Sequence, residues 1–256
     1  MVEAQSSAEG LDGLAISRSS TSGADGVDWP AGTLMARLGE SSRQDLLGLA
    51  LPREVPAGDV LIRQGEVRNH VLLLRSREAA LSACVKISAA SRSGYETLLG
   101  IRVSGDVVGE LAALRGTARS ATVTTCTTTL VHNIPHGSFI AFLNSHADAW
   151  EAMCRMIADR LDWANRRRLD FAGYDVPNRL ARILLELAER HGFSTAEGYE
   201  LGVRLSHTEL GRLIGAGEDA IGLALRQLRS QGLVKSAYRS VTINDLDRLR
   251  VLADDI

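Results

Sequence analysis

The chain has 256 residues, of which 45% are hydrophobic, and it carries a formal charge of −2 at pH 7. This length suits two modest domains with additional segments, and the apolar fraction is typical of a globular protein with a sizeable core. No apolar run approaches the roughly 20 residues of a membrane-spanning helix, so no membrane partner is expected. The lack of a basic excess argues against a dedicated nucleic-acid binder, although a chain average can hide a basic patch on one domain.

The three cysteines, Cys84, Cys126 and Cys154, lie far apart in the sequence, and none belongs to a Cys-x-x-Cys pair. Their spacing excludes a local zinc or iron–sulfur motif, and we expect no metal site. Each cysteine is predicted to be a buried, small apolar residue in a reducing compartment.

Residues 1–28 are rich in Ser, Gly and Ala, and they lack a basic start followed by an apolar stretch. We predict a disordered tail rather than a secretory signal. Ordered structure is predicted to begin at Trp29-Pro30. Leucines at helical spacing on either side of Ser41-Ser42 then predict two short helices that lead into a sheet.

Between residues 53 and 135, short β-prone runs alternate with turn residues such as Gly58-Asp59 and Gly105-Asp106. Many short strands at even spacing predict a β-sandwich or a barrel-like roll. The predicted strands lie at 60–63, 71–74, 80–87, 97–103, 107–108 and 121–134.

The stretch 109–122 lies between a strand and a threonine-rich run, and its side chains suit a phosphate ester joined to a sugar. The Glu110 carboxylate can accept hydrogen bonds from a ribose hydroxyl, and the planar fork of Arg119 matches an anionic phosphate. Ser120 adds a hydroxyl donor, and Gly109 permits a close approach of backbone or ligand. The same residues also fit an ion pair between Arg119 and Glu110 that braces a β-turn.

Read as a whole, the stretch runs Gly-Glu-Leu-Ala, a short gap and then Arg-Ser-Ala-Thr. It resembles the phosphate-binding cassette of cyclic-nucleotide-binding domains, and the glycine-containing segments 56–66 and 105–110 also match the β-roll of that family. The resemblance implies that Glu110 holds the ribose hydroxyl and that Arg119 and Ser120 hold the cyclic phosphate. The family usually has a glycine after the strand at 71–74, whereas this chain has Arg75-Ser76-Arg77-Glu78, so that loop is expected to differ in shape. The expected cyclic-nucleotide site comprises Gly109, Glu110, Leu111, Ala112, Arg119, Ser120 and Asn165.

A long helix is predicted at 147–171, with an apolar stripe spaced by three and four residues: Trp150, Met153, Ile157, Leu161 and Ala164. Such a stripe fits the seam of a two-stranded coiled coil, but it also fits an amphipathic helix that lies on the β-roll. The resemblance implies a dimer helix that also closes over the nucleotide base. The base-contacting positions are Ala164 and Asn165, where the family commonly has Thr-Ser, and only the Asn165 amide can pair with a purine edge. The run of arginines at 166–168 is expected to be solvated.

Residues 173–177 break the helix, which places a hinge near Asp175, and a further helix is predicted at 178–191. Ser206 and Glu209 then form a capping box, and the pattern of helix, Gly215 turn and second helix over 206–229 predicts a helix-turn-helix. Strands near 231–234 and 240–243 predict a β-wing, and a last helix follows at 247–253. The segment 176–243 resembles the winged helix of the CRP/FNR transcription regulators, although similar three-helix folds occur without DNA contact.

The predicted recognition helix has unusual chemistry. In the CRP/FNR family it opens Ser-Arg-Glu with another Arg one turn later, whereas this chain has Gly217-Glu218-Asp219 and then Leu223. Carboxylates face a phosphate polyanion badly, although a Glu can accept a hydrogen bond from cytosine. Arg212 and Lys235 remain for phosphate contacts. The expected DNA-binding residues are Ser206, His207, Thr208, Glu218, Asp219, Leu223 and Arg226.

The sequence therefore predicts an α+β chain with an N-terminal cyclic-nucleotide-binding β-roll, a long dimerisation helix and a C-terminal winged helix-turn-helix. The predicted divisions are a tail at 1–28, the β-roll at 29–145, the dimerisation helix at 146–173 and the winged helix at 174–256. The resemblance implies a homodimeric, cytoplasmic transcription regulator of double-stranded DNA, gated by cAMP or else cGMP, with RNA polymerase or another protein as a further partner. No nucleophile–base arrangement is visible, so an enzyme is not expected.

Two alternatives stay open at this point. One is a cyclic-nucleotide-binding adaptor whose degenerate recognition helix binds protein. The other alternative is a regulator in which the cassette is a structural relic that no longer binds nucleotide.

Overall fold

The computed structural model describes residues 29–77 and 83–254. The predicted tail at 1–28 lies outside these ranges, as do Glu78 and the start of the strand predicted at 80–87. Among the described residues, none of the helices combines the length and the apolar character needed to cross a bilayer.

The N-terminal half is a β-roll of two four-stranded sheets in which every strand pair is antiparallel. The strands of the first sheet are β1 (Pro52–Val55), β3 (Val71–Arg75), β6 (Val107–Val108) and β8 (Thr129–Ile134), in the order β1-β8-β3-β6. The strands of the second sheet are β2 (Val60–Ile62), β4 (Cys84–Ala90), β5 (Glu96–Val103) and β7 (Thr122–Thr125), in the order β2-β7-β4-β5. The run predicted at 121–134 is thus two strands, and β1 was not predicted.

The first four residues of strand β3, Val71–Leu74, are apolar and buried, and both faces of the strand are covered. Leu72 and Leu74 pack between the two sheets with residues such as Val85 and Val123. Val71 and Leu73 face the opposite way, into a second core formed with helices. These helices are α1 (Leu34–Arg37), α2 (Glu40–Gly48), α4 (His136–Ser145) and the N-terminal part of α5 (Ala147–Gly173).

The long helix α5 has two different faces: one covers the β-roll, and the coiled-coil seam on the other stays a prediction. Met153 and Met156 are buried in the core of the β-roll, as an amphipathic covering helix requires. Leu161, in contrast, is 60% exposed, and Trp150 and Phe171 are exposed on the same helix. The predicted stripe is therefore divided between an internal face and a face that lacks a partner within the described protomer.

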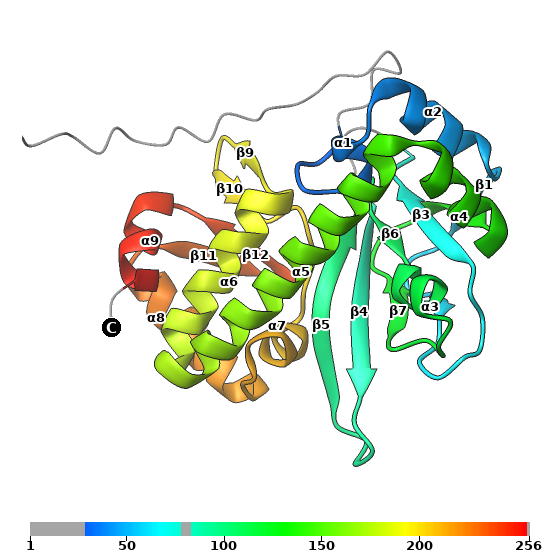
Figure 1. Cartoon of the computed structure of the whole chain (residues 1–256). Coiled ribbons are helices and arrows are strands. Elements are labelled where there is room, and N and C mark those ends of the chain that lie inside the picture. Colours follow the sequence, from blue (N-terminus) through cyan, green and yellow to red (C-terminus); the bar gives the residue numbers. More distant parts are fainter. Residues whose placement is uncertain (1–28, 78–82, 255–256) are drawn as a thin grey trace, which may run out of the picture.

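As far as residue 254, the last one described, the C-terminal half contains four helices and one antiparallel sheet, and α5 runs beside α6 (Figure 1). The helices are α6 (Val176–His191), α7 (His207–Ile214), α8 (Glu218–Ser230) and α9 (Leu246–Asp254). The strands are β9 (Phe193–Thr195), β10 (Gly198–Glu200), β11 (Val234–Ala237) and β12 (Ser240–Ile243), in the order β11-β12-β10-β9. Sequence patterns predicted the two strands of the wing and a loop with some strand character at 192–205, and that loop adds the hairpin β9–β10 to the sheet.

A third hydrophobic core extends across both halves of the protein. Cys84 of β4 and three residues of β5 cluster with the interior of the winged helix. Helix α7 lies beside β5 in Figure 1. The chain changes direction at Tyr174-Asp175, where α5 ends and the Asp175 side chain caps α6 by accepting from the Asn178 N–H.

Candidate functional site

A tight turn begins the cassette. Gly109 has φ +85° and is the N-cap of the short helix α3 (Glu110–Arg115). A Cβ atom at this position would collide with Arg119 Nη1 and would lie 3.1 Å from the carbonyl oxygen of His70. Only glycine meets both the conformational and the spatial requirement, because other L residues rarely adopt this φ.

The Arg119 guanidinium is held by backbone rather than by Glu110. Its side chain is buried, with 3% of the residue exposed. Nη1 donates to the Gly109 carbonyl at 2.8 Å, and Nη2 donates to the His70 carbonyl at 2.7 Å. The Arg119–Glu110 ion pair considered from the sequence is therefore not what orders this turn. Burial lowers the pKa of Arg119, while Glu66 and Glu110 oppose that shift, and the group remains a cation at neutral pH.

One nitrogen of Arg119 has no partner among the described residues. Nε is buried and has no hydrogen-bond partner among the described residues. A buried unsatisfied donor is costly, and a cationic one costs more than a neutral one. An anionic oxygen placed beside it would satisfy both the donor and the charge, so this part of the cassette fits a phosphate.

Glu110 is joined to the long helix. It is 5% exposed, and its Oε1 accepts from Arg160 Nη1 at 2.6 Å. Arg160 Nη2 also binds Asp106 Oδ1 at 3.2 Å and the Val107 carbonyl at 3.1 Å. Although burial lowers it, the pKa of Arg160 is raised overall by the two carboxylates. The sugar-binding carboxylate expected from the cassette is thus directly connected to α5.

Arg160 is the main site residue that the sequence reading missed. It lies four residues after Met156 and seven after Met153, so it shares the buried face of α5. A charged residue on an otherwise buried helical face needs a buried partner of opposite charge. That position on the helix is the signal that could have identified it.

The other expected cassette residues differ in exposure. Ala112 is buried, Leu111 is 40% exposed and Ser120 is exposed. Asn165 is exposed on α5, on a different side of the helix from the buried methionines. The structure therefore brings Gly109, Glu110 and Arg119 together within the protomer, while the nucleotide-binding roles of all seven expected residues stay predictions.

The helix-turn-helix has the predicted local geometry. The Ser206 side chain accepts from the Glu209 N–H at 3.2 Å, and Glu209 Oε2 accepts from the Ser206 N–H at 2.8 Å, which is a complete capping box. A Cβ at Gly211 would collide with the carbonyl oxygen of Ala216, so the small residue permits the sharp turn between α7 and α8. Ile221, Leu225 and Leu228 point into the core as predicted.

The outer face of α8 carries the unusual residues expected from the sequence. Glu218, Asp219 and Arg226 are exposed, and Leu223 is 62% exposed. His207 and Thr208 are exposed at the start of α7, and Thr208 Oγ1 donates to Glu218 Oε2 at 2.6 Å. The residues predicted to contact DNA therefore form one surface, apart from Ser206, which is engaged in the cap.

Ion pairs connect the winged helix to the β-roll. Glu209 forms ion pairs with Lys86 of β4 and, at 3.3 Å, with Arg239 of the wing. Arg212 pairs with Glu96 of β5 at 2.6 Å. Arg212 was expected to contact DNA phosphate, but in this structure it is bound to the β-roll instead.

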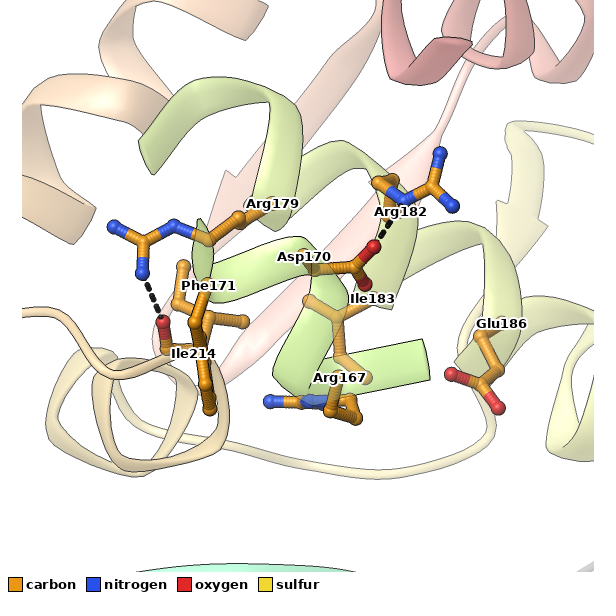
Figure 2. Close-up of a pocket in the computed structure, with 8 residues that line it drawn as sticks. All are labelled: Arg167, Asp170, Phe171, Arg179, Arg182, Ile183, Glu186 and Ile214. Carbon is orange, nitrogen blue, oxygen red and sulfur yellow. Dashed lines mark hydrogen bonds and ion pairs between the residues drawn. The ribbon is translucent and has the colours of Figure 1, made fainter. Parts of the chain in front are cut away.

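Arginines also cluster at the hinge between α5 and α6 (Figure 2). Arg182 of α6 binds Asp170 of α5 at 2.9 Å, and Arg179 of α6 donates to the Ile214 carbonyl at 2.9 Å, so α6 is joined to both α5 and the end of α7. Arg167 lies over the rings of Trp163 and Phe171 and is only 7% exposed, and burial lowers its pKa to about 10. The prediction that 166–168 are solvated holds for Arg166 and Arg168 but is wrong for Arg167.

Fold and site together define a class of protein: a β-roll with a phosphate-binding cassette, connected through a long helix to a winged helix-turn-helix. Two family models match the chain, the cyclic nucleotide-binding domain over residues 52–146 and the Crp-like helix-turn-helix domain over residues 178–252. Among the described residues, no group of three or more His, Cys, Asp or Glu side chains is placed to hold a metal ion.

Known proteins agree with this class. The chain is 30% identical, over 200 residues, to a CRP-like cAMP-activated global transcriptional regulator of Mycobacterium tuberculosis. The aligned residues cover 77% of this chain and 86% of that protein. FixK2 from Bradyrhizobium japonicum is similar in structure, with a TM-score of 0.68 at 19% identity over 81% of this chain and 98% of that one. The c-di-GMP-responsive regulator CLP of Xanthomonas campestris has a TM-score of 0.66 at 23% identity over 81% of this chain and all of that one.

The chain belongs to the CRP family of cyclic-nucleotide-binding transcription regulators. The predicted family, the fold class and the expectation of a regulator rather than an enzyme are confirmed. Regulators of this family bind DNA, usually as dimers.

Proposed function

We propose that this protein is a homodimeric transcription regulator whose binding to double-stranded DNA is gated by a cyclic nucleotide, with cAMP as the effector. The buried, unsatisfied Nε of Arg119 carries the proposal, because it calls for an anionic acceptor. A cyclic phosphate supplies that anion, and its ribose supplies a hydroxyl for Glu110. Such a regulator would act in the cytoplasm, with RNA polymerase or another protein as a further partner.

The gating mechanism follows from Arg160. A ribose hydroxyl that donates to Glu110 would share the carboxylate with Arg160, which belongs to α5. The position of α5 therefore depends on whether Glu110 is engaged by ligand. A shift of α5 would be transmitted to the winged helix through the hinge contacts of Arg179 and Arg182, and the ligand would favour one of two existing arrangements.

The exposed side of α5 supports the dimer. Trp150, Ile157, Leu161 and Ala164 follow one another at steps of seven, four and three residues, which keeps them on one face of a helix. Leu161 and Trp150 are exposed on the protomer, and a second copy of the helix would cover them. Asn165 would then lie near the two-fold axis, where the predicted contact with the base takes place.

Ligand binding is tested by the melting temperature of the purified chain with cAMP, cGMP or c-di-GMP. A ligand at 100 times its Kd should stabilise the folded protein by about 2.7 kcal/mol. Arg119→Lys keeps the charge but loses the planar fork, so it should reduce the shift with cAMP. Arg115→Ala, at the exposed end of α3, is the matched control and should leave the shift unchanged. No shift in the unsubstituted chain with any of the three nucleotides would refute the proposal and favour a relic cassette.

One observation favours the adaptor as a second candidate function. The exposed face of α8 combines the Glu218 and Asp219 carboxylates with the apolar Leu223, which suits a protein surface better than a phosphate backbone. The double substitution E218R/L223R distinguishes the two functions. If the unsubstituted chain does not bind DNA and the double variant does, the adaptor is supported. If the unsubstituted chain binds specific fragments and the double variant changes which ones, the regulator is supported.

A further inference from the structure

Two cysteines that are 42 positions apart in the sequence meet across neighbouring strands. Cys84 is the first residue of β4, and Cys126 directly follows β7. Val85 pairs with Thr125 in the antiparallel register, and the Cys126 N–H donates to the Cys84 carbonyl at 2.7 Å, so the two cysteines lie opposite each other. The two thiols are hydrogen-bonded to each other, and both are free.

This backbone arrangement can accept a disulfide. Directly opposite residues in an antiparallel pair point to the same face, with Cα atoms about 4.5–5.5 Å apart. Disulfides usually join Cα atoms that are about 4.4–6.8 Å apart. Bond formation would therefore need a local adjustment of the two thiols rather than a rearrangement of the strands.

The pair lies where the two halves of the protein meet. Cys84 is fully buried in the core that the β-roll shares with the winged helix, and the half-buried Cys126 packs against that core. Lys86, two residues after Cys84 and on the same face of β4, forms the ion pair with Glu209 of α7. A change at the two sulfurs therefore acts on the face against which α7 is docked.

We propose that Cys84 and Cys126 form a reversible disulfide on reaction with a hydroperoxide, and that this bond gives the regulator a redox input at the junction of β-roll and winged helix. Cys154 is the third cysteine of the chain, and it is removed in the experiment described below. The expectation that all three cysteines are buried is wrong for Cys154, which is exposed on α5.

The two sulfurs have different roles in the reaction. The hydrogen bond from Cys84 lowers the pKa of Cys126 against the effect of burial, and Lys86 lowers it further, whereas the same bond and burial raise the pKa of Cys84. The Cys126 thiolate attacks the hydroperoxide R–O–OH at its terminal oxygen, and with one proton this gives Cys126–SOH and the alcohol ROH. The Cys84 sulfur then attacks the sulfenic sulfur, its proton leaves with the hydroxyl as water, and the S–S bond forms. Two thiols are oxidised by two electrons, and the peroxide is reduced.

The experiment uses the full chain with Cys154→Ser, treated with hydrogen peroxide in the folded state. Intact mass should fall by two hydrogens and recover with dithiothreitol, and a non-reducing peptide map should join residues 84 and 126. In the same background, Cys84→Ser should accumulate a sulfenic acid at Cys126 that dimedone traps, while Cys126→Ser should give none at Cys84. Oxygen addition without loss of two hydrogens in the Cys154→Ser chain, or a disulfide that forms only in denaturant, would overturn the proposed site.

The regulatory part of the proposal is measured separately. Hydrogen exchange of the α7 amides should differ by several-fold between the oxidised and the reduced Cys154→Ser chain, and peroxide should have no such effect on the further variant with Cys126→Ser. Equal exchange of α7 in the two redox states, with the disulfide demonstrated by mass, would overturn the redox input.

Discussion

The charge network around Arg160 gives the sharpest test of how the site is built. Arg160→Met keeps an unbranched apolar stem but leaves Glu110 and Asp106, which are 5% and 7% exposed, without their arginine. Removing one partner of a buried ion pair costs about 3–5 kcal/mol, because the remaining charge is buried and uncompensated. For a chain of this size each kcal/mol lowers the melting temperature by about 2–4 °C, so we expect a decrease of about 6–20 °C.

The same helix provides the matched control. Arg155 pairs with Glu151 at 2.6 Å, but both side chains are more than 60% exposed. Exposed pairs contribute about 0–1 kcal/mol, so Arg155→Met should change the free energy of unfolding by no more than that. The assay is urea-induced unfolding followed by circular dichroism, with Arg160→Met, Arg155→Met and Glu110→Gln/Arg160→Met compared. The double variant should recover part of the loss, because a neutral amide replaces the stranded carboxylate. A free energy for Arg160→Met within 1 kcal/mol of Arg155→Met would refute the reasoning.

Three further predictions follow from individual residues. Gly109→Ala should destabilise the chain by at least about 1–3 kcal/mol and abolish the cAMP-induced rise in melting temperature. Gly116 also has a positive φ but has open space around it, so Gly116→Ala should keep that rise. Calorimetry that finds the two variants alike would contradict this prediction. Burial lowers the pKa of His191 to about 4, whereas its pKa in the unfolded chain is about 6.5. Below pH 6.5 the unfolded chain therefore binds a proton that the folded chain does not, and up to about 3 kcal/mol of the free energy of unfolding should be lost as the pH falls from 6.5 towards 4. Urea unfolding should show a flatter pH dependence for His191→Gln, and an unchanged slope would exclude His191 as the cause. Leu161→Glu should convert a dimer to a monomer in sedimentation velocity. Leu99→Glu, at another exposed position on β5, should not. If the Leu161→Glu chain is still a dimer, α5 does not form the interface.

Local sequence patterns were sufficient for much of the fold. The apolar run at 71–74 marked a strand, and the Ser206–Glu209 spacing marked the start of α7. Gly109 was expected at a close approach, and the structure places Arg119 against it. In each case the chemistry lies within a few residues, so it can be read without knowing the fold.

The remaining features depend on contacts between distant segments. Arg160 meets Glu110 across 50 positions, and only the fold shows that the buried face of α5 lies on the cassette. Arg167 of α5 belongs to a run of arginines that is expected to be solvated. The turn at Tyr174 brings α6 alongside, and the Arg167 side chain is buried where the two helices meet. Cys84 and Cys126 meet only because β4 and β7 are paired. The domain divisions at 29–145, 146–173 and 174–256 stay predictions, and the shared core shows that the two halves are packed together.

The central claim is that a cyclic nucleotide gates DNA binding. The most direct measurement is retention of pooled genomic DNA fragments by the purified full chain, with and without cAMP, across a salt series. We expect particular fragments to be retained only with cAMP and their retention to weaken as salt rises, because phosphate contacts release counterions. Retention that is the same with and without cAMP, or no retention in either state while cAMP still raises the melting temperature, would contradict it.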